Sequence, residues 1–296
     1  MVVTASFVLL AAVGAVVIRL AAEHIVFQES CTADAGGTKA RVSLEQVQNA
    51  STIAAVAERR GLPARAATIA IATALQESRL RNLSHGDRDS LGLFQQRPSQ
   101  GWGTAEQVMD PVYASNAFYD ALVKIDGYKT MNINDAAQMV QRSGHPEAYN
   151  KHEARARALA SALMGYSPAA LSCAVRPNSV NTEQADGNGL TPRAETVLTS
   201  LQKAFGTQDT SGYANGGHSL DVSFAPVTAT RNREGWAAAQ WLVANADQFD
   251  IGTVIFDGKI WSAGRSVQGW RDYTPPSGFT NDDAAMLRDH VHLDVR

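Results

Sequence analysis

Apolar residues recur at helical spacing through the first half of the chain. From Gln46 to Arg60 they fall three and four positions apart and stop before Gly61, which predicts an amphipathic helix. The segment from Arg65 to Leu80 is apolar on nearly every face, as expected of a helix at the centre of a bundle. Three later segments repeat the helical pattern, at 111–123, 133–141 and 146–164. We therefore expect an all-α domain.

The pattern changes after residue 190. A helix is expected from Thr191 to Phe205, because the proline after Thr191 suits a first helical turn. Short runs of strand-forming residues predict strands at 220–224, 253–256 and 291–295, with a tryptophan-bearing helix at 235–246. This mixture is typical of a small α+β domain.

Two stretches of small and polar residues divide the chain. The first, Ala33 to Lys39, is interpreted as part of a linker at 23–41, and a second linker is expected at 176–189. Between and after them lie domains at 42–175 and 190–296. At 45% hydrophobic residues, the 296-residue chain is long enough for two cores and for an overall α+β fold class.

An uninterrupted apolar run extends from Val2 to Ile18. As a helix it would measure about 26 Å at ~1.5 Å per residue, slightly less than a ~30 Å hydrocarbon core. Residues 1–22 are therefore interpreted as a membrane anchor or as a secretory signal peptide. The first interpretation leaves the domains extracytoplasmic and attached to the cell membrane, and the second makes the protein secreted.

Cysteine content and charge narrow the function classes. Cys31 and Cys173 bracket the first domain, and an even count in an exported chain favours a disulfide over two free thiols. Neither cysteine lies near a pattern typical of a metal site or a nucleophile. The formal net charge is −3 and the basic residues are scattered, which argues against nucleic acid as a partner.

Glu77 is placed at the carboxyl end of the predicted central helix. The helix dipole is negative there and the neighbouring helix faces are apolar, so both effects favour the neutral carboxyl. A carboxylic acid that retains its proton can give it to a glycosidic oxygen. The polar neighbours Gln76, Ser78 and Arg79 leave an ordinary solvated helix end as the alternative.

Motifs around and after Glu77 resemble a known superfamily. Glu77-Ser78, Gly92-Leu-Phe-Gln95 and Asp110-Pro111 are similar to the Glu-Ser, Gly-Leu-Met-Gln and Asp-Pro series of soluble lytic transglycosylases and goose-type lysozymes. The fuller form, with Asn-Leu and Gly-Trp-Gly, resembles a branch found in exported actinobacterial proteins. The resemblance covers about residues 42–166 and implies a lysozyme-like fold that cleaves glycans without a cofactor.

The resemblance also implies roles for individual residues. Glu77 would be the general acid/base and Ser78 would support it. Phe94, Trp102 and Tyr149 are candidates for stacking on sugar rings, with a place in the core as the alternative. The residues expected to line the sugar cleft are Gly92, Leu93, Phe94, Gln95 and Gln96.

A second carboxylate would decide between two reactions. Water positioned by such a group gives hydrolysis, whereas attack by a muramic hydroxyl leaves an anhydro product. Asp87 and Asp89 are the nearby acids, but they lie in a turn-forming string and are expected to bond local backbone or Arg88. Both outcomes therefore stay open.

The second domain carries a different set of polar residues. The segments Gly217-His-Ser-Leu-Asp221 and Asp289-His-Val-His-Leu-Asp294 resemble zinc D-alanyl-D-alanine carboxypeptidases and the Hedgehog-type fold. The resemblance implies Asp221 and His292 as metal ligands and Asp289 as the base. It also implies the stem peptide of peptidoglycan as a partner.

The expected zinc site departs from that family at one position. The first ligand should be a histidine seven residues before Asp221, and that residue is Ala214. His218 would replace it only if its loop bent back, and a catalytic zinc needs three protein ligands. Zinc is therefore expected only in a substituted site, and a degenerate peptide-binding module is the favoured interpretation.

Together these observations predict an exported peptidoglycan-remodelling enzyme that cuts the glycan strand, as a lytic transglycosylase or a muramidase. Its partners would be the glycan strand, the stem peptide and, through the first segment, the membrane. The alternatives are a non-catalytic envelope protein that binds peptidoglycan, or a zinc metallopeptidase that acts through the second domain.

Overall fold

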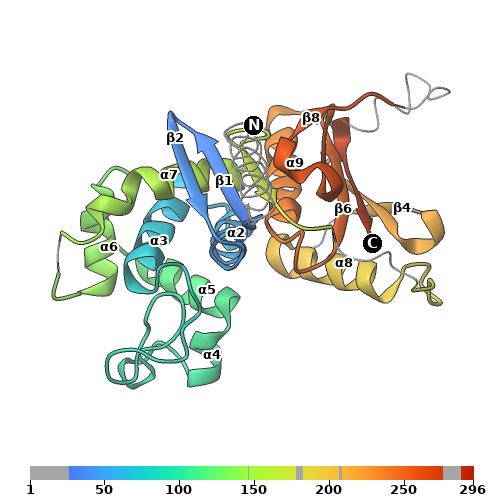
Figure 1. Cartoon of the computed structure of the whole chain (residues 1–296). Helices are drawn as coiled ribbons and strands as arrows, with labels where there is room; N and C mark the ends of the chain where they lie inside the picture. The colour runs from blue at the N-terminus through green and yellow to red at the C-terminus, as the bar shows by residue number, and fades with distance from the viewer. Residues whose placement is uncertain (1–26, 146, 178–182, 207–208, 276–287) are drawn as a thin grey trace, which may run out of the picture.

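The computed structural model describes residues 27–145, 147–177, 183–206, 209–275 and 288–296. Helices dominate the first domain and a sheet backed by helices forms the second, with the two domains packed side by side (Figure 1). The predicted membrane or signal segment, 1–22, lies outside the described residues. Within the described part of the chain, no helix is long and apolar enough to span a bilayer.

Helix α3 lies at the centre of the first domain. Every residue from Ala66 to Leu75 is buried, and α3 packs against its neighbours α2, α5, α6 and α7. This confirms the helix expected from its nearly all-round apolar pattern. The helices are α2 (Leu44–Arg59), α3 (Ala64–Glu77), α4 (Ala105–Met109), α5 (Pro111–Leu122), α6 (Ile133–Gln141) and α7 (Glu153–Leu163), with 3₁₀ turns η1 (Pro98–Gln100) and η2 (Asn150–His152).

The expectation of an all-α first domain is wrong. Strands β1 (Ser30–Ala35), β2 (Thr38–Val42) and β3 (Leu171–Ala174) form an antiparallel sheet in the order β2-β1-β3, and β1 and β2 pack on α7. Much of the expected linker at 23–41 is therefore a hairpin. Gly36 and Gly37, at φ +58° and +75°, form its two-residue turn, which needs positive φ at both positions.

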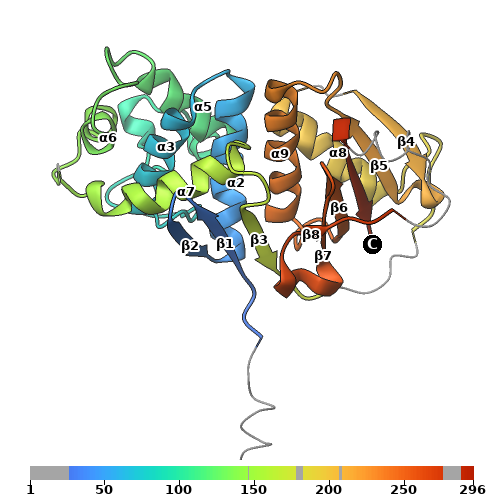
Figure 2. The ribbon, with the colours of Figure 1, turned by 90° about the horizontal axis from the view of Figure 1, so that it is seen from above.

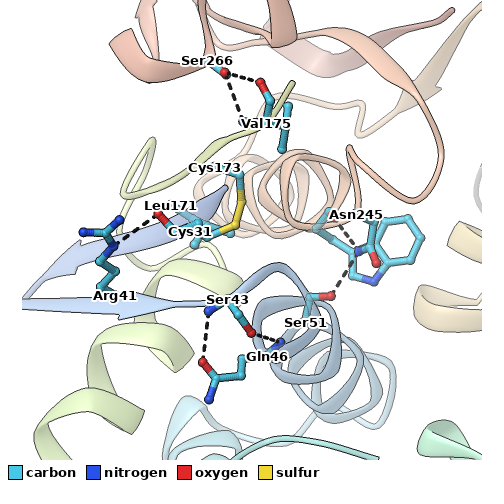
Figure 3. Close-up of a disulfide and its surroundings, with 12 residues drawn as sticks. Cys31, Arg41, Ser43, Gln46, Ser51, Leu171, Cys173, Val175, Asn245 and Ser266 are labelled. Atoms are coloured by element: carbon cyan, nitrogen blue, oxygen red, sulfur yellow. Dashed lines mark hydrogen bonds between the residues drawn. A yellow bond between two sulfur atoms is a disulfide. The ribbon is translucent and has the colours of Figure 1, made fainter. Parts of the chain in front are cut away.

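The disulfide between Cys31 and Cys173 is present, as the even cysteine count predicted. The two residues are direct partners in the pairing of β1 with β3, and both are fully buried (Figure 3). The bond joins residues 142 positions apart. It therefore closes nearly the whole first domain into a covalent loop.

A six-stranded sheet forms the second domain, in the order β4-β5-β9-β6-β7-β8. Helix α9 packs on β6 and β9 and stands between the sheet and the first domain (Figure 2). The expected helices and strands are all found, whereas β4, β7 and β8 were not anticipated. The elements are α8 (Pro192–Phe205), β4 (Thr210–Ala214), η3 (Asn215–Gly217), β5 (Ser219–Ser223), α9 (Ala229–Ala244), β6 (Ile251–Phe256), β7 (Lys259–Ser262), η4 (Ala263–Gln268), β8 (Arg271–Asp272) and β9 (His290–Val295).

The two domains share an extensive polar interface. Arg233 of α9 donates two hydrogen bonds to the Glu58 carboxylate, at 2.7 and 2.5 Å, and both side chains are largely buried. The buried amide of Gln240 accepts from Leu171 N–H at 2.7 Å and donates to the Ala162 carbonyl at 2.7 Å. Further bonds join Asn245 to Ser51 and Ser266 to Val175 (Figure 3). Such pairing fixes the domains relative to each other.

Candidate active site

Glu77 is the last residue of α3 and is half-buried. The chain then reverses sharply, because Arg79 and Leu80 both have positive φ and the Leu80 N–H bonds back to the Ala74 carbonyl at 2.9 Å. The side chain of Leu80 is fully buried by this reversal. The Glu77 carboxyl is thereby held at the edge of the core.

A tight turn lies beside the end of α3. Leu91 and Gln96 exchange two backbone hydrogen bonds of 3.0 Å, so that 92–95 form the loop between them. Gly92 has φ +75°, and a Cβ at this position would lie 2.3 Å from the Val108 carbonyl oxygen. Only glycine therefore lets this loop approach α4 so closely.

Ser78 connects Glu77 to this turn. Its buried hydroxyl lies 2.7 Å from the Leu93 carbonyl oxygen and 3.0 Å from that of Ala74. The Glu-Ser and Gly-Leu-Phe-Gln motifs thus meet through one hydrogen bond. The Ser78 hydroxyl is therefore engaged within the fold, where it fixes the position of the turn, and is not available to a ligand.

Tyr149 is the direct partner of the acid. Its hydroxyl donates to Glu77 Oε1 at 2.7 Å, and its backbone N–H donates to Asn134 Oδ1 at 3.2 Å. Burial, together with the adjacent negative charge of Glu77, raises the pKa of Tyr149. The phenol therefore stays protonated and is a permanent donor to the carboxyl.

Two residues expected to stack on sugars are core residues. Phe94 is fully buried and stacks on Phe118, with ring centroids 4.7 Å apart, and Tyr149 is also fully buried. Neither ring has a free face for a sugar, so both take the core position that the sequence had left as the alternative. Leu93 is likewise buried, and Gln96 is buried with its amide donating to the Ala114 carbonyl at 3.1 Å.

Gln95 is the partly accessible residue of the turn. Its amide donates to the carbonyls of Gly92, at 3.3 Å, and His85, at 3.4 Å. Trp102 is half-buried and lines a cavity of about 810 Å³ with Gln141, whose amide donates to the Phe94 carbonyl at 2.9 Å. The hydrogen bond between Gln141 and Phe94 therefore connects the lining of this cavity to the turn.

Asp87 and Asp89, the next two acids after Glu77 in the sequence, lie in environments different from that of Glu77. Asp89 accepts from Arg97 Nε at 2.7 Å and from Ser99 N–H at 2.8 Å. The bonds from Ser99 and Arg97 hold the pKa of Asp89 well below its usual range. Asp87 is exposed. Asp89 is therefore an ionised residue that fixes its loop, but its partners are Arg97 and Ser99 and not the expected Arg88.

In the second domain, four polar side chains form a chain on the sheet face opposite α9. His292 Nδ1 lies 2.8 Å from Asp221 Oδ1, and its Nε2 lies 3.4 Å from Asp294 Oδ1. Ser219 donates to the same Asp294 oxygen. Although burial opposes the charge, these carboxylates raise the pKa of His292 to about 9, so that the ring is an imidazolium at neutral pH.

These residues do not fit the expected zinc site. Asp221 and His292 bond each other, and the family's first ligand position is occupied by Ala214. Asp289 bonds the neighbouring His290 ring at 2.5 Å. Among the described residues, no group of three His, Cys, Asp or Glu is placed to hold a metal ion. His218 lines a cavity to which Asp294 of this network also contributes.

Ser219 was not singled out from the sequence, and Asp294 was counted among the polar residues of this domain without a role of its own. Each stands two positions from a predicted ligand on the same strand, Asp221 or His292, and so points to the same face of the sheet. That spacing was the available signal.

Comparison with known proteins concerns the second domain. A family described as VldE, C-terminal domain, matches residues 186–284. The matched stretch begins shortly before α8, ends between β8 and β9, and does not extend into the first domain. None of the curated proteins matches this chain.

Proposed function

We propose that this protein cleaves the glycan strand of peptidoglycan, with Glu77 as general acid/base. The observation that carries the proposal is the 2.7 Å hydrogen bond from buried Tyr149 to a half-buried carboxyl at the end of a core helix. Such a carboxyl is fixed in one orientation and partly shielded from water, which suits a general acid/base that meets a glycosidic oxygen in a set geometry. The disulfide is consistent with an extracytoplasmic location, where the substrate occurs.

The order of motifs supports the same chemistry. Glu77-Ser78 and the 92–95 turn resemble the corresponding motifs of lytic transglycosylases, and here they are joined through Ser78 and the Leu93 carbonyl. Asp89 is committed to Arg97 and Ser99. This favours single-acid chemistry, in which a sugar hydroxyl attacks internally, over hydrolysis assisted by Asp89.

Digestion of purified peptidoglycan by the full-length protein tests the proposal, with soluble products identified by mass. We expect muropeptides from the wild type and a loss of rate of 10²-fold or more in Glu77→Gln, the usual size of general acid–base contributions. Glu45→Gln is the matched control, because Glu45 is an exposed carboxylate whose nearest cation, Arg81, is 3.7 Å away. Anhydro ends would specify transglycosylation, and reducing ends hydrolysis.

Two results would overturn the proposal. If the wild type and Glu77→Gln both bind insoluble peptidoglycan and release nothing, the protein is a non-catalytic envelope component. If products form equally with both proteins, another residue supplies the proton. Thermal melting of each variant establishes that the compared proteins are folded.

A further inference from the structure

A cavity of about 700 Å³ lies at one end of the sheet in the second domain. Its walls come from η3, from β6, from the end of β9, and from the corner where β7 passes into η4. The volume is in the range of small-molecule sites. The side chains that the argument uses are Asn215, Thr253, Ser262, Arg265, Asp294 and Arg296.

The lining is polar nearly throughout. Among its described residues, Val295 is the one apolar side chain, and it is buried. Gly252 and Gly264 contribute main chain alone. An acyl chain or an aromatic ring would find little apolar wall here, so its transfer from water would gain little free energy. The cavity therefore suits a ligand that is polar on all sides.

Charges of both signs line the cavity. Within the described residues, neither the Arg265 nor the Arg296 guanidinium has a hydrogen-bond or ion-pair partner, so their donors are open to a ligand. The Asp294 carboxylate can only accept. Burial opposes its charge, but hydrogen bonds from His292, Ser219 and Thr253 hold the pKa of Asp294 below its usual value. A ligand must therefore donate and accept within a short distance.

Ser262 adds a hydroxyl whose hydrogen is still to be donated. Its Oγ accepts from Arg271 Nη2 at 2.8 Å, so one lone pair of the oxygen is engaged and the O–H is left for a ligand. The exposed Asn215 side chain offers both an amide donor and a carbonyl acceptor. Donors and acceptors therefore alternate around the lining.

This alternation excludes several ligand classes. An anion attracted by the two arginines would also meet the Asp294 carboxylate, and a cation would meet the two guanidinium groups. A peptide main chain carries its N–H and C=O groups between side chains that need apolar pockets, which this lining does not provide. A hydroxyl both donates and accepts, and the hydroxyls of a sugar ring follow one another along its rim.

We propose that this cavity binds a neutral sugar ring, whose neighbouring hydroxyls donate to Asp294 and accept from Arg265 and Arg296. The Ser262 hydroxyl donates to a further ring oxygen. The site belongs to the second domain and does not depend on Glu77 or on glycan cleavage, so it stands or falls separately from the proposed function.

A ligand-observed NMR titration of the full-length protein at pH 7 tests the proposal. The probes are methyl β-D-glucopyranoside and its galactose epimer, compared with N-acetyl-alanine methylamide, free alanine and inorganic phosphate. We expect at least one sugar to bind with a Kd of about 1 mM, as a neutral ligand of this size should, and tenfold more tightly than the other three compounds. Arg265→Gln and Ser262→Ala should weaken sugar binding about tenfold and about fivefold, the usual effects of losing a charged and a neutral hydrogen bond.

Arg81→Gln is the matched control, because it removes an exposed arginine charge from the first domain and should leave sugar binding unchanged. Sugar binding that neither cavity variant weakens would place the sugar elsewhere, including beside Glu77, and would overturn the proposal. Binding of neither sugar would also overturn it, as would equal or tighter binding of alanine, the methylamide or phosphate. Arg265 is exposed, so its substitution disturbs no packing, and thermal melting of each variant checks that it is folded.

Discussion

The Tyr149 hydroxyl and the Glu77 carboxyl form a hydrogen bond of 2.7 Å across 72 positions of sequence. The contact depends on the register of α7 against α3, because Tyr149 precedes η2 and α7. A second contact, 3.2 Å between His152 Nε2 and Gln76 Oε1, joins the same two segments. The acid is thus oriented by the segment that leads into another helix and not by its own.

Removal of the Tyr149 hydroxyl should lower the rate of glycan cleavage strongly and the stability of the fold only slightly. In Tyr149→Phe the Glu77 carboxyl loses its fixed donor and becomes free to rotate, so we expect glycan cleavage to fall about tenfold while unfolding free energy falls by ~1 kcal/mol. Tyr119→Phe is the matched control, since that buried hydroxyl donates to the Ile53 carbonyl at 3.0 Å. It should cost similar stability and leave activity intact. Equal activities of the two variants would contradict the positioning role of Tyr149.

Gly92 should be far less tolerant of alanine than Gly101. Both have positive φ, at +75° and +82°, and both substitutions carry ~1 kcal/mol or more of backbone strain. A Cβ at Gly92 would additionally meet the Val108 carbonyl at 2.3 Å, whereas nothing lies within 4 Å at Gly101. We expect Gly92→Ala to lower unfolding free energy by about 3 kcal/mol and Gly101→Ala by about 1 kcal/mol in urea titrations. Similar losses would show that the turn does not pack on α4.

The second domain should lose stability in alkaline solution through His292. Its pKa is about 9 in the folded protein and 6.5 in the reference state, so the protonated ring stabilises the fold. This contribution, about 3 kcal/mol, is complete below pH 6.5 and is lost as the pH rises through 9. Urea titrations at pH 6, 7.5 and 9 should show the decline. In His292→Gln the decline between these pH values should disappear, and a decline equal to that of the wild type would rule out His292 as its source.

Local patterns were sufficient for most helices and for the disulfide. The apolar run at 66–75 is long enough to indicate a buried helix, and Cys31 and Cys173 were the sole possible pair. The β1–β2 hairpin was missed, because its short strands contain small and polar residues that become half-buried only against α7. Gly36-Gly37 between alternating residues was the signal, and it was interpreted as a linker.

The chemistry of the candidate site could be predicted in part from the sequence. Glu77 was singled out by its place after an apolar helix, but the roles of its neighbours depended on packing. The sequence left Phe94 and Tyr149 open between sugar stacking and a place in the core, and both are fully buried. The pairing of Asp221 with His292 follows from the neighbouring positions of β5 and β9 in the sheet, an order that distant segments of one chain do not reveal.

The Glu58–Arg233 ion pair and the hydrogen bonds from α9 and η4 to the β3 segment hold the two domains in one fixed arrangement. Separation of the two domains would leave the largely buried Glu58 and Arg233 charges without their partners, so we expect the domains to unfold together and not one after the other.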